Sequence, residues 1–568
     1  MTRIVELEIE NFRGISTFSQ KFDRDVVCLI GRGDAGKSTI LDAISYVLSS
    51  AWNLPIYDTD FYGLNTSNPL VIRVTLSDLP DELMTEGKYG LFIKGYSQDT
   101  GSISPELSEG FVPALTIELR VQDDLEPKWH VTSGRAEQTK EISSRDRAKL
   151  NCFMISDYVD SHFSWNKGNP LYALFKSEDP DEQQEKLVLE ALREAKSKLD
   201  GAAFEHFGGV TGTVKDNAAQ LGLNINEIQT TLDFKDINMK EGKVSLHLGN
   251  VPFRLMGKGS KRLASIAIQT AIARNGGIAL IDEIEQGLEP DRIKHVVRAL
   301  KAGSPGQVIM TTHSRDVVTE LEVQNLLVLH SDRSAGVLKS EYLDIDNGKL
   351  KGVVRACPEA FFARKVVVCE GATEVGICRA IDQFRISSGK TPMSFNGCAY
   401  VDGTGSSFSE RAMNISEAGM DVSVLCDSDT DDKLKHSKDA MKGASIEIFD
   451  CDSSSSIEAQ VFQDLPWGSI LDAVNYVMQA HGRTTESIDD ALKARCTPAT
   501  SFNDNWRETD TLEIRKALAA VSVVDGKEWF KRIDHGERLG QIILVSLADM
   551  EGTQLQTSIE GLISWIDE

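Results

Sequence analysis

The sequence predicts an α/β protein built from two successive domains, each with a parallel β-sheet. Three observations lead to this prediction: a glycine-rich loop between an apolar strand and a helix at residues 31–39, a second apolar strand that ends in two acids at positions 282 and 283, and a renewed alternation of strands and helices after residue 345. At 568 residues the chain is also too long for a single hydrophobic core. We therefore expect one domain over residues 1–345 and another over residues 346–568.

Composition is typical of a globular protein, with 41% hydrophobic and 26% charged residues. Glu6 and Glu8 interrupt the start, where a secretory signal needs an apolar run, and no apolar stretch is long enough to span a bilayer. The nine cysteines form no Cys-x-x-Cys pair and no cluster at zinc-binding spacing, which indicates reduced thiols. These features predict a cytoplasmic protein that makes no membrane contact.

The net charge of −25 argues against a broad basic surface for nucleic acid. A contact with a phosphate backbone would need a local basic patch or bound metal ions. Candidate basic groups are Lys258, Lys261, Arg262, Lys531, Arg532 and Arg538.

The glycine-rich loop has the pattern and the flanks of a nucleotide-phosphate site. Residues 31–39, GRGDAGKST, fit G-x-x-x-x-G-K-[ST], follow the apolar run 26–30 and precede the helical pattern 40–44. Glycines allow backbone N–H groups to surround phosphates, and the helix N-terminus adds partial positive charge. Lys37 would contact the β- and γ-phosphates of ATP, and Ser38 would bind Mg²⁺. The residues predicted to bind the nucleotide here are Gly31, Gly33, Gly36, Lys37, Ser38 and Thr39.

Two later strands supply further candidates for the same site. Residues 277–281 form a small apolar strand that ends in Asp282 and Glu283. Asp282 would hold the Mg²⁺ of ATP together with Ser38, and Glu283 would polarise the attacking water. His313 follows the strand 307–310, at a position from which an imidazole can sense the γ-phosphate.

The order of these motifs resembles the ABC-type ATPases of the structural-maintenance and recombination-repair group. The opening strand 3–10, the turn 11–14, the phosphate loop and the segment ALIDEIEQGLEP match that group, and residues 257–262 would be a divergent signature loop. The resemblance implies at least a homodimer, because the signature loop of one head completes the ATP site of another. Residues 181–200 form a charged amphipathic pattern within a short helical insertion at about 170–235, which suits either a dimerisation helix or a helix packed on its own head.

In the second half, acids follow three predicted parallel strands. Residues 365–369 lead to Glu370 and Glu374, residues 399–401 lead to Asp402, and residues 422–426 lead to Asp427 and Asp429. Ligands bind at the carboxyl ends of such strands. Close carboxylates repel one another unless a cation neutralises them, so Mg²⁺ or Mn²⁺ is the expected partner. Two such ions would clamp the attacking and leaving oxygens of a phosphodiester.

This half resembles a Toprim domain, with its core at about 362–465 and a helical part at 466–568. The matching residues are Glu370, Gly371 and Glu374, and the pair Asp427 and Asp429. The resemblance implies a further carboxylate, for which Glu458 is the first candidate and Glu447, Asp450 and Asp452 are alternatives. It also implies a lysine that stabilises the transition state, with Lys531 ahead of Lys527.

An ABC-type head followed by a Toprim domain is similar to the overcoming-lysogenization-defect (OLD) nuclease family, which includes the nuclease subunit of the Gabija anti-phage system. The resemblance implies an ATP-regulated endonuclease with two Mg²⁺ or Mn²⁺ ions, acting on DNA rather than RNA as a homodimer or tetramer, in anti-phage defence, with a second defence protein as a further expected partner. The alternative is an ATP-driven sensor or scaffold of the DNA-repair type with a non-catalytic Toprim-like domain. A nucleotidyl-transfer enzyme is a third reading, against which the missing Cys/His zinc cluster argues. Whether ATP activates or restrains cutting stays open.

Overall fold

The structure is a computed structural model that describes residues 2–85, 87–134, 139–164, 168–178, 190–191, 194, 245–302, 306–332, 336–343, 348–428, 432–496 and 502–568. The chain divides into two compact units. The first comprises Met1–Val27, Ser38–Thr311 and Arg333–Val337, and the second comprises Cys28–Lys37, Thr312–Asp332 and Leu338–Glu568. The predicted boundary at residues 345–346 and most of the predicted helix 181–200 lie outside the described residues, so the division at residue 345 and the dimerisation helix remain proposals.

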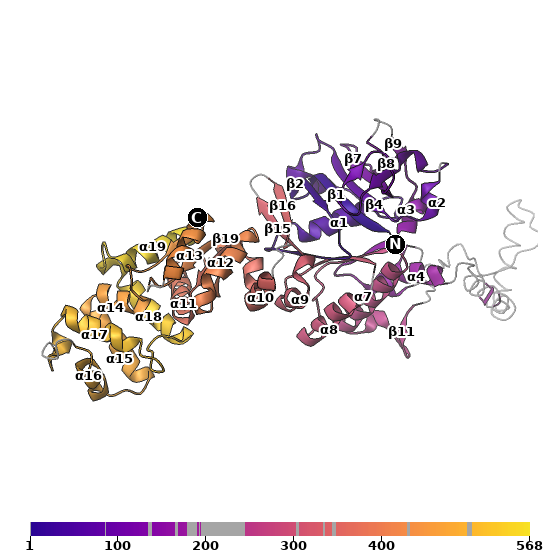
Figure 1. Cartoon of the computed structure of the whole chain (residues 1–568). Helices are drawn as coiled ribbons and strands as arrows, with labels where there is room; N and C mark the ends of the chain where they lie inside the picture. Colours follow the sequence, from indigo (N-terminus) through magenta and orange to yellow (C-terminus); the bar gives the residue numbers. More distant parts are fainter. Residues whose placement is uncertain are drawn as a thin grey trace, which may run out of the picture. The chain divides into compact units, whose positions relative to one another are not determined.

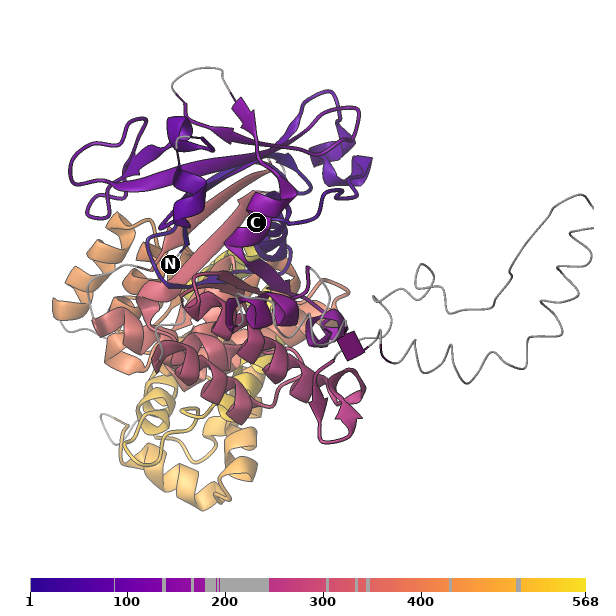
Figure 2. The ribbon, with the colours of Figure 1, turned by 90° about the vertical axis from the view of Figure 1, so that its right-hand side faces the viewer.

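The first half of the chain contributes a large mixed sheet. Its strands follow the order β10-β13-β14-β3-β15-β16-β2-β1-β4-β7-β5-β6, and β8 and β9 extend it from β7. The described strands have these bounds: β1 Arg3–Phe12, β2 Ile15–Lys21, β3 Val26–Ile30, β4 Leu70–Ser77, β5 Lys94–Tyr96, β6 Ile103–Ser104, β7 Val112–Val121, β8 Lys128–Thr132, β9 Thr139–Glu141, β10 Cys152–Ile155, β13 Ile278–Ile281, β14 Gln307–Thr311, β15 Leu326–Asp332 and β16 Val337–Tyr342. Strands β10, β13 and β14 run parallel. Strands β1, β2, β4 and β7 are antiparallel neighbours in the indigo and purple part of the chain (Figures 1 and 2).

The strands that carry the predicted nucleotide motifs are fully buried. Every residue of β3, β13 and β14 is buried, which is the pattern expected of central parallel strands covered on both faces. Helix α1 (Lys37–Val47) begins in the glycine-rich loop, and α7 (Lys258–Arg274) packs against β13. The described part of this half also contains helices α4 (Pro170–Glu178), α8 (Pro290–Ala302) and α9 (Arg315–Glu320).

The second half contains a separate four-stranded parallel sheet. Its order is β18-β17-β19-β20, with β17 at Lys365–Cys369, β18 at Cys398–Asp402, β19 at Asp421–Leu425 and β20 at Glu447–Phe449. Helix α10 (Gly348–Ala356) precedes the sheet, and α11 (Ala372–Ser387), α12 (Phe408–Glu417) and α13 (Asp432–Gly443) connect its strands. The three predicted strands are present, and β20 is an additional strand.

In the described residues after position 456, six α-helices form the C-terminal part (Figure 1): α14 (Ile457–Asp464), α15 (Trp467–Ala480), α16 (Thr485–Lys493), α17 (Leu512–Ser522), α18 (Ile533–Val545) and α19 (Gln554–Asp567). They enclose a core that includes Phe462, Trp506, Trp529 and Phe530, all of them buried. Helix α18 packs closely on α11 because glycines face the contact: a Cβ at Gly536 would lie 2.5 Å from the Thr373 carbonyl oxygen. None of the described helices is both long and apolar enough to cross a membrane.

Candidate nucleotide and metal sites

The glycine-rich loop adopts a backbone that requires glycine. Gly31 has a φ of +139°, and a Cβ there would lie 2.6 Å from the carbonyl oxygen of Leu329. Gly36 also has a positive φ, of +84°. The buried Lys37 ammonium donates to the carbonyl oxygens of Gly31 and Arg32, both at 2.9 Å. The loop thus curls around the amine that would contact the nucleotide phosphates.

The two predicted magnesium ligands lie side by side. The Ser38 hydroxyl donates to the Asp282 carboxylate at 2.9 Å, although 244 positions separate them in the chain. A hydroxyl and a carboxylate at the carboxyl end of a strand form the usual Mg²⁺ pair of a nucleotide-binding loop. Glu283 follows in the left-handed region, with a φ of +46°, a backbone cost that is typical of functional positions.

Thr311 is a site residue that the sequence interpretation missed. Its hydroxyl donates to the Asp282 carboxylate at 2.6 Å and accepts the backbone N–H of Glu283 at 2.7 Å. It therefore fixes both acids at once. A threonine at a strand end is too common a feature to mark such a role, and only the alignment of β14 beside β13 reveals it.

Arg262 was expected among the basic surface groups, and this expectation is wrong. Its guanidinium is buried and donates to the backbone carbonyl oxygens of Asp282, of Glu283 at 2.8 Å and of Ser156 at 2.9 Å. The positive charge is used inside the fold to hold the turn that carries the two acids. Lys261 is also engaged, in an ion pair with Asp160 at 2.8 Å.

His313 lies just beyond the carboxyl end of β14, where it is exposed. Its ring stacks on Phe362, with centroids 6.5 Å apart. The structure thus places the imidazole at a strand end, as the sequence predicted, and gives it an aromatic support.

The acids of the second half gather at the carboxyl edge of the four-stranded sheet. Glu370 follows β17, and its carboxylate accepts the backbone N–H of Asp427 at 2.9 Å. The Asp427 carboxylate in turn accepts the N–H of Ile457, the first residue of α14, at 2.6 Å. Glu374 lies in the first turn of α11 and accepts the N–H of Gly371 at 2.8 Å. Asp429 lies outside the described residues.

Burial and like charge make these acids hard to ionise. Burial first, and then the charges of Glu374, Glu458 and Glu370, raise the pKa of Asp427 to about 8. Glu374 is only 4% exposed, and burial followed by the charges of Glu458 and Glu370 raises its pKa to about 7. Such a set of hard oxygen donors fits a divalent cation, which would neutralise the repulsion. Among the described residues, no group of three His, Cys, Asp or Glu side chains has the geometry of a formed metal site.

The alternatives for the further carboxylate are placed differently from Glu458. Glu458 is buried in the first turn of α14, and its charge raises the pKa values of both Glu374 and Asp427. Glu447 is exposed at the start of β20, away from the carboxyl edge. Asp450 pairs with Lys438 at 2.9 Å, and Asp452 accepts bonds from Gln460 and Gln463. The geometry therefore favours Glu458.

Lys438 is a second residue that the sequence interpretation missed. Its ammonium donates to the Asp427 carbonyl oxygen and to the Ser428 hydroxyl, both at 3.0 Å, as well as to Asp450. It braces the loop that follows β19. A lysine on a polar helix gives no sequence signal for this role.

Lys531 is exposed and lies two residues before α18. The carbonyl oxygen of its neighbour Phe530 accepts the Thr373 hydroxyl at 3.2 Å, one residue from Glu374. Lys527 lies four residues earlier, in a turn held by Arg483. The contact of Phe530 with Thr373 thus places the residue next to Lys531, but not Lys527, against the motif, which keeps Lys531 as the first candidate.

Comparison with known proteins gives two family matches. Residues 26–320 match the family described as "AAA domain, putative AbiEii toxin, Type IV TA system", and residues 361–429 match the family described as "Overcoming lysogenization defect protein-like, TOPRIM domain". The predicted fold class, an α/β ATPase domain followed by a Toprim domain, is confirmed. No curated protein matched the chain.

Solved structures similar to the chain include three ATPase heads. The Smc head domain from Pyrococcus furiosus, bound to the C-terminal domain of ScpA, has 16% identity and a TM-score of 0.35, covering 61% of this chain and 97% of that one. The SMC head domain from Thermotoga maritima has 13% identity and a TM-score of 0.28, covering 60% and 100%. The recombination mediator RecF has 12% identity and a TM-score of 0.32, covering 60% and 98%.

Proposed function

We propose that this chain, which belongs to the AAA ATPase family and carries an OLD-like Toprim domain after its ATPase domain as in OLD-family fusions, is an ATP-regulated endonuclease that depends on divalent metal ions. The observation that carries the proposal is the set of acids at the carboxyl edge of the second sheet. Glu374 is buried and Asp427 is half-buried, and both have raised pKa values, so their ionised forms are costly to the fold unless a cation neutralises them.

The acids at the carboxyl edge of the second sheet would together bind the metal ions. Glu370, Glu374, Asp427 and Glu458 would bind the ions, with Asp429 as a further proposed ligand. Bound divalent ions supply a nucleophilic water and neutralise the charge that develops on the phosphodiester. Lys531 would contact the phosphate at the same edge and stabilise that charge. Lys438 would keep Asp427 in place through its backbone and Ser428.

The ATPase half would control this chemistry. Lys37 would bind the β- and γ-phosphates, Ser38 and Asp282 would hold one Mg²⁺, and Glu283 would orient the attacking water. Thr311 would hold the Asp282 carboxylate and the Glu283 backbone in position through its two hydrogen bonds. Gly31, Gly33, Gly36 and Thr39 would line the phosphate loop, and His313 would lie toward the γ-phosphate.

Further parts of the proposal concern substrate and setting. We infer DNA as the substrate and a homodimer or tetramer as the assembly. We also propose a role in anti-phage defence together with a second defence protein, as the resemblance to the OLD family implies. The nine free cysteines support a cytoplasmic setting.

The test is a cleavage assay on plasmid DNA, linear DNA and RNA, with Mg²⁺ or Mn²⁺ and with or without ATP. Asp427→Asn should abolish cutting and keep nucleotide binding, because the ATP site uses other residues. Glu447→Gln is the matched control: it removes an exposed acid from the same sheet and should cut like wild type. Full cutting by Asp427→Asn would refute the site. Failure of the wild type to cut any substrate would favour the sensor or scaffold function.

A further inference from the structure

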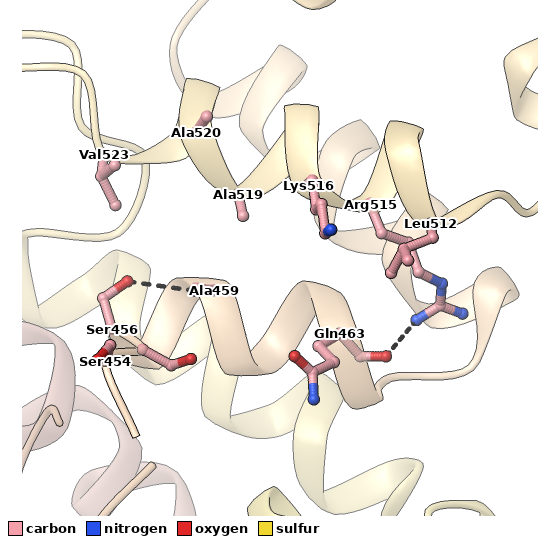
Figure 3. Close-up of a pocket in the computed structure, with 11 residues that line it drawn as sticks. Ser454, Ser456, Ala459, Gln463, Leu512, Arg515, Lys516, Ala519, Ala520 and Val523 are labelled. Carbon is pink, nitrogen blue, oxygen red and sulfur yellow. Dashed lines mark hydrogen bonds between the residues drawn. The ribbon is translucent and has the colours of Figure 1, made fainter. Parts of the chain in front are cut away.

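A pocket of about 430 Å³ lies between α14 and α17. The serine loop, Ser454–Ser456, closes one end, and Figure 3 shows the two helices running along opposite sides. Lys516 and Ala519 lie on the side of α17 that faces α14 (Figure 3). This groove is distinct from the acidic edge where the metal ligands gather.

The groove nevertheless adjoins the candidate metal site through shared backbone. The Ser454 N–H donates to the Ser428 carbonyl oxygen, and the Ser428 N–H donates to the Ser455 carbonyl oxygen, both at 3.0 Å. Ser428 is the residue after Asp427, and the Asp427 carboxylate accepts the N–H of Ile457, the residue after the serine loop. The serine loop and the residue after it are therefore bonded to the segment that carries the proposed metal ligand Asp427. The same serines line the groove.

The groove is basic in an otherwise acidic chain. Of the described residues that line it, Arg515 and Lys516 are basic and none is acidic, whereas the net charge of the chain is −25. Arg515 connects α17 to the end of α14. Its guanidinium pairs with Asp510 at 2.6 Å and donates to the carbonyl oxygen of Gln463 at 2.7 Å. It also donates to the carbonyl oxygens of two residues close to Gln463. Within the described part of the chain, Lys516 makes no ion pair and is exposed, so its charge is available to a ligand.

The rest of the lining suits a sugar–phosphate backbone. Ala459, Ala519 and Ala520 leave room for a sugar, and the hydroxyls of Ser454 and Ser456 can donate to phosphate oxygens. A strand whose cleaved phosphate sits at the metal cluster must continue over an adjoining surface, and backbone neutralisation needs cations there.

We propose that the groove between α14 and α17 binds the nucleic-acid strand beside the cleaved phosphate, with Lys516 pairing with a backbone phosphate. The inference rests on the proposed endonuclease function and names a part of its substrate path. It places the substrate contact on the C-terminal helices rather than on the Toprim sheet itself.

The test measures binding separately from cutting. A fluorescently labelled single-stranded DNA oligonucleotide is titrated into the full-length Asp427→Asn protein at several salt concentrations. Adding Lys516→Ala should weaken binding several-fold and lower the salt slope by about one. Lys516→Arg should restore both, and Ala519→Glu should weaken binding further by placing an acid in the groove. Lys442→Ala is the control, because this exposed lysine ends α13 just before β20, on the opposite side of the sheet from the acids.

Unchanged affinity and salt slope in both Lys516→Ala and Ala519→Glu would refute the proposed binding of nucleic acid in the groove. An absence of oligonucleotide binding by the parent protein would refute it as well. Nucleotide titration of each variant checks that the chain is folded. If the parent protein binds through Lys516 but the wild type cuts no substrate, the groove stands and the endonuclease function fails.

Discussion

At the scale of single residues, Thr311 offers the sharpest test of the nucleotide site. Thr311→Val keeps the shape but removes the hydroxyl, which leaves the Glu283 N–H without its partner and removes one of the hydrogen bonds that hold the Asp282 carboxylate. Loss of such a supporting bond typically costs about 10–100-fold in metal affinity or activity. We expect magnesium-dependent ATP binding, measured by titration at varied Mg²⁺, to weaken within this range. Thr311→Ser should stay near wild type, and equal magnesium dependence in Thr311→Val would contradict this role.

The residues that could be predicted share one property: their type and spacing are rare together. Lys37, Ser38 and Asp282 stand in patterns with a single chemical interpretation, and the structure brings Ser38 to Asp282. Thr311 and Lys438 act through neighbours that lie far away in the sequence, so no local pattern marks them. The prediction for Arg262 was wrong because an arginine in a loop such as the predicted signature loop 257–262 usually faces solvent. Here its guanidinium is buried and donates to backbone carbonyl oxygens.

At the scale of secondary-structure elements, the buried strands were predictable and the helix contacts were not. The runs that became β3 and β13 are uninterrupted and apolar, and β17 is apolar after Lys365, as central parallel strands require. Strand β20 is three residues long, too short for a periodicity to show. The groove between α14 and α17 depends on two helices about 50 positions apart, and only tertiary packing brings them together.

The contact between α11 and α18 makes a prediction at this scale. Gly536→Ala would place a Cβ 2.5 Å from the Thr373 carbonyl oxygen, so α18 must move away from the residue that precedes Glu374. We expect a loss of about 1–3 kcal/mol in unfolding free energy, which denaturant titration would measure, together with weaker Mn²⁺ binding. Gly443→Ala is the control, since nothing lies within 4 Å of a Cβ there. Wild-type stability in Gly536→Ala would show that the helices are not held this closely.

At the scale of the whole molecule, the buried acids connect stability to pH. The pKa values of Glu374 and Asp427 in the fold, about 7 and about 8, lie above the ordinary values of about 4 that they regain on unfolding. The folded protein therefore holds protons that the unfolded chain has released. This contribution to stability is complete below about pH 4 and is lost as pH rises through 7 to 8. A divalent cation reverses the trend, because it binds the ionised carboxylates of the fold.

We therefore expect the unfolding midpoint of the metal-free protein to fall between pH 5 and pH 8.5, and added Mg²⁺ to raise it more at the upper end. The fluorescence of the buried Trp506 and Trp529 would report on the half that carries the acids. The high negative charge of the chain adds its own pH dependence, so the informative quantity is a difference between variants. Glu374→Gln should flatten both the pH and the Mg²⁺ response, while Glu447→Gln, which removes the same charge from an exposed position, should leave them unchanged. Equal responses in the two variants would mean that Glu374 does not take part in metal binding, which would remove a central ligand from the proposed nuclease site.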